Sequence, residues 1–207
     1  KNNSVLIFYN KIMSKKLWEA SIVQKKNSLL RKYEHFISKK FNKKFNKKYE
    51  NILKWSIKNS GNFWSSIWDF SKIKGLKGKA KIKKSKVFYK NVFLPDSKLN
   101  YAENLLSKNN RDKAITFISE NGFREERNWQ DLNVNVGKIS KFLRDINIKK
   151  KDRVVAYLPN HIQTVEAFIA TSSLGAIWSS CSPDFGVKGV IERFFQINPK
   201  VLFVADQ

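Results

Sequence analysis

The second half of the chain alternates short apolar runs with helix-type segments, and this alternation constrains the fold more than any other feature. The apolar runs span residues 153–158, 176–180 and 201–205. Helices are expected between them, at 161–174 and 186–196, and Gly175 takes the position of a C-terminal cap. Strands that alternate with helices form a parallel sheet through right-handed βαβ connections. The sequence therefore predicts an α/β fold whose ligand sites lie beyond the carboxyl ends of the strands.

A β-hairpin and an amphipathic helix are predicted ahead of this sheet. Strand-type segments at 114–119 and 124–129 flank the Asn-Gly pair at 121–122, which favours the positive φ of a tight turn. Either Asn128 or Asp131 can begin the helix that follows. Its apolar residues recur at steps of four and three and indicate one buried face: Leu132, Val136, Ile139, Leu143 and Ile146.

The first hundred residues have a different character. Residues 14–60 are predicted to be helical, because apolar residues recur there near helical spacing between lysines. Those residues are Ile22, Leu29, Leu30, Tyr33, Phe36 and Ile37. Phe41 and Phe45 belong to a tandem four-residue duplication and are expected on one helix face as a core contact. A membrane-surface contact is the alternative for that pair.

A dense group of aromatic residues comes next and is expected to anchor packing against another domain face. It consists of Trp55, Phe63, Trp64, Trp68 and Phe70. Nucleobase stacking is disfavoured, because no arginine is interleaved with these rings. The lysine-rich segment 73–86 lacks periodicity and indicates an exposed linker.

The formal charge of +24 suggests a polyanionic partner until its distribution is considered. Residues 1–100 hold 26 Lys and Arg against 5 Asp and Glu, and Arg31 is the only arginine among them. Nucleic-acid sites usually include arginine, whose planar fork pairs with guanine or phosphate in ways that lysine does not. We therefore favour a solvated lysine-rich surface that reflects codon usage, and no specific nucleic-acid partner. A lysine-rich RNA-binding or anionic-membrane-binding module is the alternative function.

Several classes of protein are disfavoured by what the chain contains. One cysteine, Cys181, excludes an internal disulfide framework, and Cys181 with His35 and His161 gives no zinc-site spacing. The apolar run at 5–9 is far shorter than the roughly 20 residues of a membrane-spanning helix. We expect a cytoplasmic protein with no metal site and no membrane span.

The ends of the chain suggest boundaries. The first residue is Lys1 and the only methionine is Met13, so residues 1–12 are expected to be an upstream leader without structure. Residues 13–100 are then a helical, aromatic- and lysine-rich region, and 101–207 are the first part of a larger domain. Because the chain stops on an apparent buried strand, we expect a fragment, one half of a split gene, or a pseudogene product.

Short sequence words, taken in order, resemble the N-terminal third of the acetoacetyl-CoA synthetases, within the AMP-dependent, acyl-adenylate-forming ligases. The words cover Lys16–Glu19, Trp55–Ser56, Phe63–Phe70, Leu99–Leu106, Gly175–Gly186 and Gln196–Phe203. The word at Leu99–Leu106 is shared with acetyl- and propionyl-CoA synthetases. The loop at Trp178–Gly186 distinguishes the acetoacetyl-CoA synthetases from the acetyl-CoA synthetases better. Pro183 and Asp184 stand where the corresponding loop of acetyl-CoA synthetases resembles a pair of glycines.

The resemblance implies a fold and a reaction. The fold is α/β, with a helical N-terminal extension packed on a truncated adenylate-forming domain that consists of a β-hairpin and a βαβαβ parallel sheet. The family converts an acid, ATP with Mg²⁺, and CoA into an acyl-CoA, AMP and pyrophosphate, and here the implied acid is acetoacetate. Its phosphate-binding loop, ribose-binding Asp and catalytic Lys are implied to lie beyond Gln207. No catalytic residue is therefore assigned in this chain, and the chain alone is expected to be inactive.

The resemblance also implies where CoA would be contacted. The loop that begins at Ser182 corresponds to one near the CoA nucleotide in related enzymes, and Arg193 on the next helix could reach a CoA phosphate. The candidate CoA-binding residues are Pro183, Asp184, Phe185, Gly186 and Arg193. Asp184 has a favoured alternative role as the N-terminal cap of the helix. An ion pair with a neighbouring acid is the alternative for Arg193.

Three nearby residues have favoured structural interpretations. Cys181 is expected to be a small buried residue, because a nucleophilic thiol needs a neighbouring base or cation and CoA supplies the thiol of the implied reaction. His161 is expected to be an exposed polar residue at a helix start, and an active-site role is the less favoured alternative. Trp178 is expected to pack against the sheet.

Overall fold

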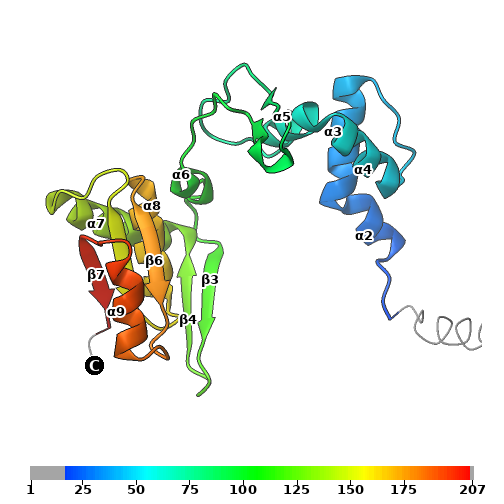
Figure 1. The fold of residues 1–207 in the computed structure, drawn as a ribbon. Helices are drawn as coiled ribbons and strands as arrows, with labels where there is room; N and C mark the ends of the chain where they lie inside the picture. The colour runs from blue at the N-terminus through cyan, green and yellow to red at the C-terminus, as the bar shows by residue number, and fades with distance from the viewer. Residues whose placement is uncertain (1–16, 206–207) are drawn as a thin grey trace, which may run out of the picture. The chain divides into compact units, whose positions relative to one another are not determined.

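The computed structural model describes residues 17–205, so Met13, the expected leader at 1–12 and the last two residues lie outside the described part. The chain divides into two compact units (Figure 1). The helical unit comprises the residues up to Lys72 together with Ala80–Pro95. The sheet unit comprises Ile73–Lys79 and the residues from Asp96 onward. The chain thus leaves the helical unit, enters the sheet unit and returns once before the sheet begins.

The helical unit is built from four α-helices and a small antiparallel ribbon in its described part. The helices are α2 (Ile22–Asn27), α3 (Leu29–Phe41), α4 (Tyr49–Lys58) and α5 (Ser60–Phe70), and the ribbon pairs β1 (Ile82–Lys83) with β2 (Val92–Phe93) around the short 3₁₀ helix η1 (Phe88–Lys90). Ser21 begins α2 with a capping box that it shares with Gln24. The predicted helical character of this region is confirmed, with a break between α3 and α4.

That break corrects the prediction for the duplicated phenylalanines. The helix α3 ends at Phe41, because Asn42 adopts a left-handed conformation with φ of 47°. Phe45 therefore lies in the turn before α4 rather than on a shared helix face. The predicted core contact is nevertheless confirmed, since Phe45 is 1% exposed and its ring lies 5.5 Å from that of Trp55.

The helical unit has a core made largely of aromatic rings. Its buried members are Tyr33, Ile37, Phe45, Ile52 and Trp55, with Phe36, Phe41, Phe63, Ile67 and Phe70 packed against them. Of the predicted aromatic group, Trp55, Phe63 and Phe70 pack in this core, among the helices of their own unit. The helical spacing of apolar residues also predicted more burial than the structure has at the start of the region, where Ile22 and Leu29 are largely exposed.

The segment 73–86 contains no helix, in line with the predicted loop, but it is tied at two places. Leu76 and Lys98 exchange backbone hydrogen bonds of 2.8 and 2.7 Å, and β1 pairs with β2. Gly78 adopts a φ of 76°, and a Cβ there would stand 2.4 Å from Cβ of Asp96. A side chain at Gly78 is therefore excluded by both the backbone conformation and the available space.

The sheet unit has the predicted α/β fold, with a hairpin followed by a parallel sheet (Figure 1). Its elements are α6 (Tyr101–Leu105), β3 (Lys113–Ile118), β4 (Arg124–Asn128), α7 (Trp129–Asp145), β5 (Arg153–Tyr157), α8 (Ile162–Ser173), β6 (Ile177–Cys181), α9 (Val187–Phe195) and β7 (Val201–Val204). The strand order is β6-β5-β7, and both pairings are parallel. The first strand of the alternation, β5, is therefore central.

Local signals fix the helix ends of this unit. Asn128 begins α7, and its Oδ1 accepts a hydrogen bond of 2.8 Å from the backbone N–H of Asp131. Of the two residues that the sequence offered as the start, Asn128 is thus the cap. Gly175 follows α8 with a φ of 69°, which confirms the predicted position for a glycine. The predicted positive φ at the hairpin turn is found at Gly122, at 83°.

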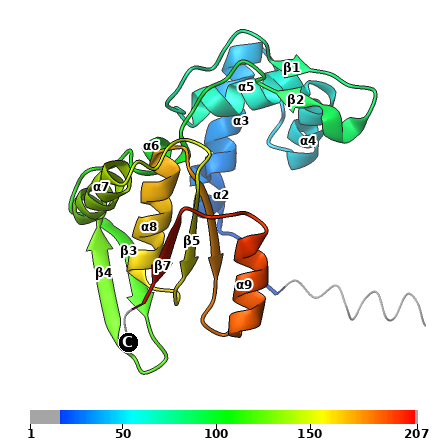
Figure 2. The same ribbon diagram turned by 60° about the vertical axis from the view of Figure 1, so that its left-hand side comes forward.

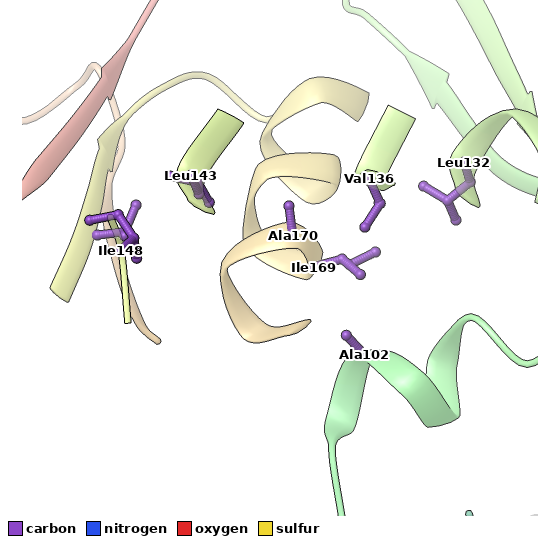
Figure 3. Close-up of a cluster of buried hydrophobic side chains, with 8 residues drawn as sticks. Ala102, Leu132, Val136, Leu143, Ile148, Ile169 and Ala170 are labelled. Carbon is purple, nitrogen blue, oxygen red and sulfur yellow. The ribbon is translucent and has the colours of Figure 1, made fainter. Parts of the chain in front are cut away.

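An aliphatic core lies between α6, α7, α8 and one face of the sheet (Figure 3). Its buried members are Ala102, Leu132, Val136, Leu143, Ile148, Val154, Ile169 and Ala170. The predicted stripe on α7 is confirmed for three of its five residues, and Ile139 packs against the cluster while partly exposed. The prediction of burial is wrong for Ile146, which is 44% exposed. The helix ends at Asp145, and Ile148 enters the core instead.

The central strand supplies both faces of the sheet. Val154 packs in the cluster with α8, whereas Val155 packs with Cys181 and with Phe194 of α9. Because successive side chains of a strand point to opposite faces, α8 and α9 cover opposite faces of the sheet (Figure 2). Burial on both faces explains why β5 is apolar without alternation.

Candidate functional site

The candidate site lies where the parallel strands end. Tyr157, Cys181 and Val204 are the last residues of β5, β6 and β7, and parallel pairing brings these carboxyl ends to one edge of the sheet. The loop between β6 and α9 spans residues 182–186, and we call it the β6–α9 loop. It contains four of the five predicted CoA-contact residues, and Arg193 follows on α9.

The β6–α9 loop is a tight turn with its own hydrogen bonds. The backbone N–H of Phe185 donates to the carbonyl of Ser182 at 3.1 Å. The hydroxyl of Ser182 donates to Oδ2 of Asp184 at 2.6 Å and accepts from the N–H of Asp184 at 3.4 Å. Side chains of Pro183, Asp184 and Phe185 stay accessible at its surface. The loop thus combines a defined backbone with exposed side chains.

The favoured role of Asp184 as a helix cap is wrong. The N-terminal cap of α9 is Gly186, and no side chain makes a capping hydrogen bond there. Asp184 stands two residues before the cap, and its carboxylate is held by the hydroxyl of Ser182. The short Ser-x-Asp turn therefore competes successfully with capping.

Arg193 contacts the loop through an aromatic ring. Its guanidinium carbon lies 4.2 Å from the centroid of Phe185, a cation–π arrangement. Within residues 17–205 no carboxylate lies within 4.0 Å of Arg193, so the alternative of an ion pair is not supported there. The structure thus brings together two predicted residues that are eight positions apart in the sequence.

Tyr157 is part of this site, and the sequence reasoning missed it. Its hydroxyl donates to the carbonyl oxygen of Pro183 at 2.9 Å and lies 3.2 Å from that of Phe185. The residue ends β5, and its ring packs against the cluster of Val155, Cys181 and Phe194. A tyrosine at the carboxyl end of a buried strand is a signal that could have found it, because the hydroxyl of a half-buried tyrosine needs a partner.

The three neighbouring residues have structural positions. Cys181 is 5% exposed in the cluster under α9, which confirms a small buried residue. His161 is exposed immediately before α8, as expected, and its ring lies 4.5 Å from that of Phe117. Trp178 packs between Phe168 and Phe203, at centroid distances of 6.1 and 6.2 Å, as predicted. These contacts provide no pair of nucleophile and base.

A cavity of about 580 Å³ lies in the helical unit, and it offers a second place for a ligand. It is lined by Ile22, Lys25, Lys26, Arg31, Glu34, His35, Ser38 and Lys47. Its central arginine is already engaged, because Arg31 donates to the carboxylate of Glu34 and to the carbonyl of Lys47. Glu34 also accepts from the N–H of Lys47 at 2.8 Å. These bonds fasten the turn after α3 and explain the polar lining without a ligand.

Within residues 17–205, no three His, Cys, Asp or Glu side chains are grouped so that they could hold a metal ion. Over the same residues, no helix has the length and apolar character needed to cross a membrane.

Comparison with known proteins shows similarity along most of the chain. Residues 105–207 match the family described as AMP-binding enzyme. The chain is 39% identical over 158 residues to the acetoacetyl-coenzyme A synthetase of Rhizobium meliloti, covering 76% of this chain and 24% of that protein. It is 36% identical over 163 residues to the malonamoyl-CoA synthetase of Penicillium aethiopicum, covering 75% and 22%.

A solved structure resembles both units. The acetoacetyl-CoA synthetase from Streptomyces lividans matches with a TM-score of 0.83 and 25% identity, over 92% of this chain and 30% of that chain. The present chain therefore spans about a quarter of the length of the curated relatives that it matches. The similarity includes the helical unit as well as the sheet unit, since it extends over nearly all of the chain.

Proposed function

Because residues 105–207 match the family described as AMP-binding enzyme, we propose that the chain forms the N-terminal part of an ATP-dependent acid–thiol ligase. The proposal rests chiefly on the relatives named acetoacetyl-CoA synthetase, of which the Rhizobium meliloti protein is 39% identical over most of the chain. The proposed substrates are acetoacetate, ATP with Mg²⁺, and CoA, and the protein is proposed to be cytoplasmic.

The proposed reaction has two steps. A carboxylate oxygen of the acid attacks the α-phosphorus of ATP, forming an acyl-adenylate and releasing pyrophosphate. The thiol of CoA then loses its proton and attacks the acyl carbon, forming the thioester and releasing AMP. Both steps require groups that stabilise developing negative charge. These groups are proposed to lie beyond Gln207, so this part of the protein is proposed to bind and orient rather than to carry out either bond exchange.

The β6–α9 loop is the part of this chain that is proposed to contact CoA. It lies at the carboxyl edge of the parallel sheet, where ligands of open α/β sheets bind. Arg193 places a cation beside the exposed ring of Phe185, which is 37% exposed. A cation next to an aromatic face suits a ligand that combines phosphates with a purine ring.

The acid is proposed to carry a carbonyl group two carbons from the carboxyl carbon. The names of the two relatives favour this class, because acetoacetate and malonamate share it and differ in a methyl against an amino group. The loop at Trp178–Gly186 supports acetoacetate, through its resemblance to acetoacetyl-CoA synthetases and through Pro183 and Asp184.

The test measures acid-dependent pyrophosphate release with ATP by the protein expressed from the complete reading frame that encodes these residues. Acetoacetate, malonamate, acetate and propionate are compared at equal concentration. Pyrophosphate release that prefers acetoacetate is the expected result. Release that prefers malonamate would keep the proposed class of acid and replace acetoacetate by malonamate as the substrate. A folded product that releases no pyrophosphate with any acid would overturn the ligase proposal.

A lysine-rich binding module is a second candidate, because residues 1–100 hold 26 Lys and Arg against 5 Asp and Glu. Binding to RNA or to anionic vesicles through charge alone should weaken steeply with salt. Retention of RNA at physiological salt by a protein that releases no pyrophosphate would favour this candidate.

A further inference from the structure

We propose that Tyr157 is a positioning residue that fixes the backbone of the β6–α9 loop in the orientation needed to receive CoA. The inference deepens the proposed function and rests on it for the identity of the ligand. Tyr157 belongs to β5 rather than to the loop, and 26 residues separate it from Pro183. Its hydroxyl therefore links the central strand to a loop whose other hydrogen bonds described above are local.

The hydroxyl acts on two peptide groups at once. It lies 2.9 Å from the carbonyl oxygen of Pro183 and 3.2 Å from that of Phe185. Since the hydroxyl has one proton, the shorter contact is the principal hydrogen bond and the longer one shares it. Both carbonyl oxygens are thereby turned toward the strand end.

Planarity of the peptide bond makes this orientation consequential. None of the described peptide bonds is cis. In a trans peptide the N–H points opposite to the carbonyl, so the N–H groups of Asp184 and Gly186 are directed away from Tyr157. Tyr157 thereby turns these two carbonyl oxygens, which would repel a phosphate, toward the strand end. The carboxylate of Asp184 stays exposed on the same loop, so the hydroxyl of Tyr157 removes only the repulsion that the two carbonyl oxygens would add.

The ring of Phe185 provides the second restraint on the same segment. Arg193 holds the ring from the outside at 4.2 Å, whereas Tyr157 holds the carbonyl of the same residue from the inside. The β5 strand that carries Tyr157 is rigidly set, since Val154, Val155 and Ala156 are completely buried. Phe185 is therefore fixed between a strand and a helix, and Tyr157 supplies the strand side.

The decisive experiment is hydrogen–deuterium exchange of the protein expressed from the complete reading frame and carrying Tyr157→Phe, which removes only the hydroxyl. Amide exchange at residues 184–187 is expected to accelerate about tenfold, as for a loop that has lost one hydrogen bond. Exchange in the core of α8 should stay unchanged. Tyr101→Phe is the matched control, because Tyr101 lies in the same unit, is 57% exposed, and its hydroxyl makes no hydrogen bond within residues 17–205. Unchanged exchange at 184–187 in Tyr157→Phe would overturn the inference.

The ligand is tested by kinetics in the complete protein. Tyr157→Phe is expected to raise the KM for CoA about fivefold to tenfold and to leave acid-dependent pyrophosphate release within twofold. Equal loss in both assays, or an unchanged KM for CoA, would contradict a role toward CoA. Faster loop exchange in a protein without ligase activity would uphold the positioning of the loop and refute the proposed function, so the two failures are distinguishable.

Discussion

The two units bury different kinds of side chains, and the difference shows how each is held together. The helical unit packs rings against rings, for example Phe41 and Phe45 against Trp55, at centroid distances of 5.1 and 5.5 Å. The core of the sheet unit consists of Leu, Val, Ile and Ala side chains from three helices, a strand and the connection between α7 and β5 (Figure 3). A few large rings therefore contribute most of the packing in the helical unit, whereas many small aliphatic contacts contribute it in the sheet unit.

Buried polar groups differ between the units as well. In the helical unit the hydroxyl of Tyr33 meets that of Ser66 at 2.7 Å, and Ser66 in turn donates to the carbonyl of Phe63. Burial raises the pKa of Tyr33, against the lowering effect of Ser66. In the sheet unit the carboxylate of Glu166, with a side chain 4% exposed, accepts from Arg127 and from Asn135, each at 2.9 Å. A charged group thus joins β4, α7 and α8.

The largest expected effect comes from removing the ring at the centre of the aromatic core. Trp55→Ala should destabilise the helical unit by about 3–5 kcal/mol, since Trp55 is 6% exposed and contacts three other rings. Amide exchange should rise throughout α3 to α5 and stay low in α8. Trp64→Ala is the control, because Trp64 is 44% exposed. A parallel rise in α8 would show that the two units do not unfold separately and would break the comparison.

A smaller effect is expected from the charged network of the sheet unit. Glu166→Ala should reduce the free energy of unfolding by about 2 kcal/mol, because it removes the buried acceptor of both Arg127 and Asn135. It leaves Arg127 with Glu125 as its remaining carboxylate partner. Asp145→Ala removes an exposed pair with Lys141 and should change stability by less than about 0.5 kcal/mol. Denaturant titration measures the free energy of unfolding of both variants. Equal losses of stability would mean that burial of the Glu166 ion pair does not determine its contribution to stability.

The smallest effect is expected in the acid sensitivity of the sheet unit's stability, through Asp152, the residue before β5. The pKa of Asp152 is lowered, first by the N–H of Lys149, at 2.8 Å, and then by the ammonium of Lys200. The resulting stabilisation is present above the ordinary carboxyl pKa of about 4 and is lost as the pH falls through the lowered value.

Asp152→Asn should therefore flatten the decline in thermal stability of the sheet unit below about pH 4. Lys200→Met should flatten it only in part, because the N–H of Lys149 remains. Melting curves between pH 7 and pH 2.5 measure both variants. A decline as steep in Asp152→Asn as in the parent would rule out this carboxylate as a source of acid sensitivity.

The sheet unit was more predictable from sequence than the helical unit, for a reason that the cores make plain. Burial of aliphatic residues on an element of regular period leaves a periodic pattern, as at Leu132, Val136 and Leu143. Aromatic residues are large enough to reach the core from turns, as Phe45 does, so their spacing does not report the element that carries them. Ile22 and Leu29 lie on helices and fit a helical period, and they are nevertheless largely exposed.

The candidate site divides in the same manner. The position of the β6–α9 loop followed from the order of strands and helices, because parallel strands end at one edge. The contacts within it did not, since Tyr157 lies on another strand and the pairing of Arg193 with Phe185 depends on where α9 begins. Asp184 is a residue type that often caps helices, but its carboxylate accepts a hydrogen bond from the hydroxyl of Ser182 instead.

The sequence by itself determined the α/β class, the hairpin, the order of strands and helices and the family resemblance, because these depend on local periodicity, turn residues and short words. Only the tertiary structure decided that β5 is central, that Ile148 replaces Ile146 in the core, and that one hydroxyl on β5 holds two carbonyls of the β6–α9 loop. Those outcomes depend on contacts between residues far apart in the chain. Such contacts are set by packing and hydrogen bonding in three dimensions, which a linear pattern does not encode.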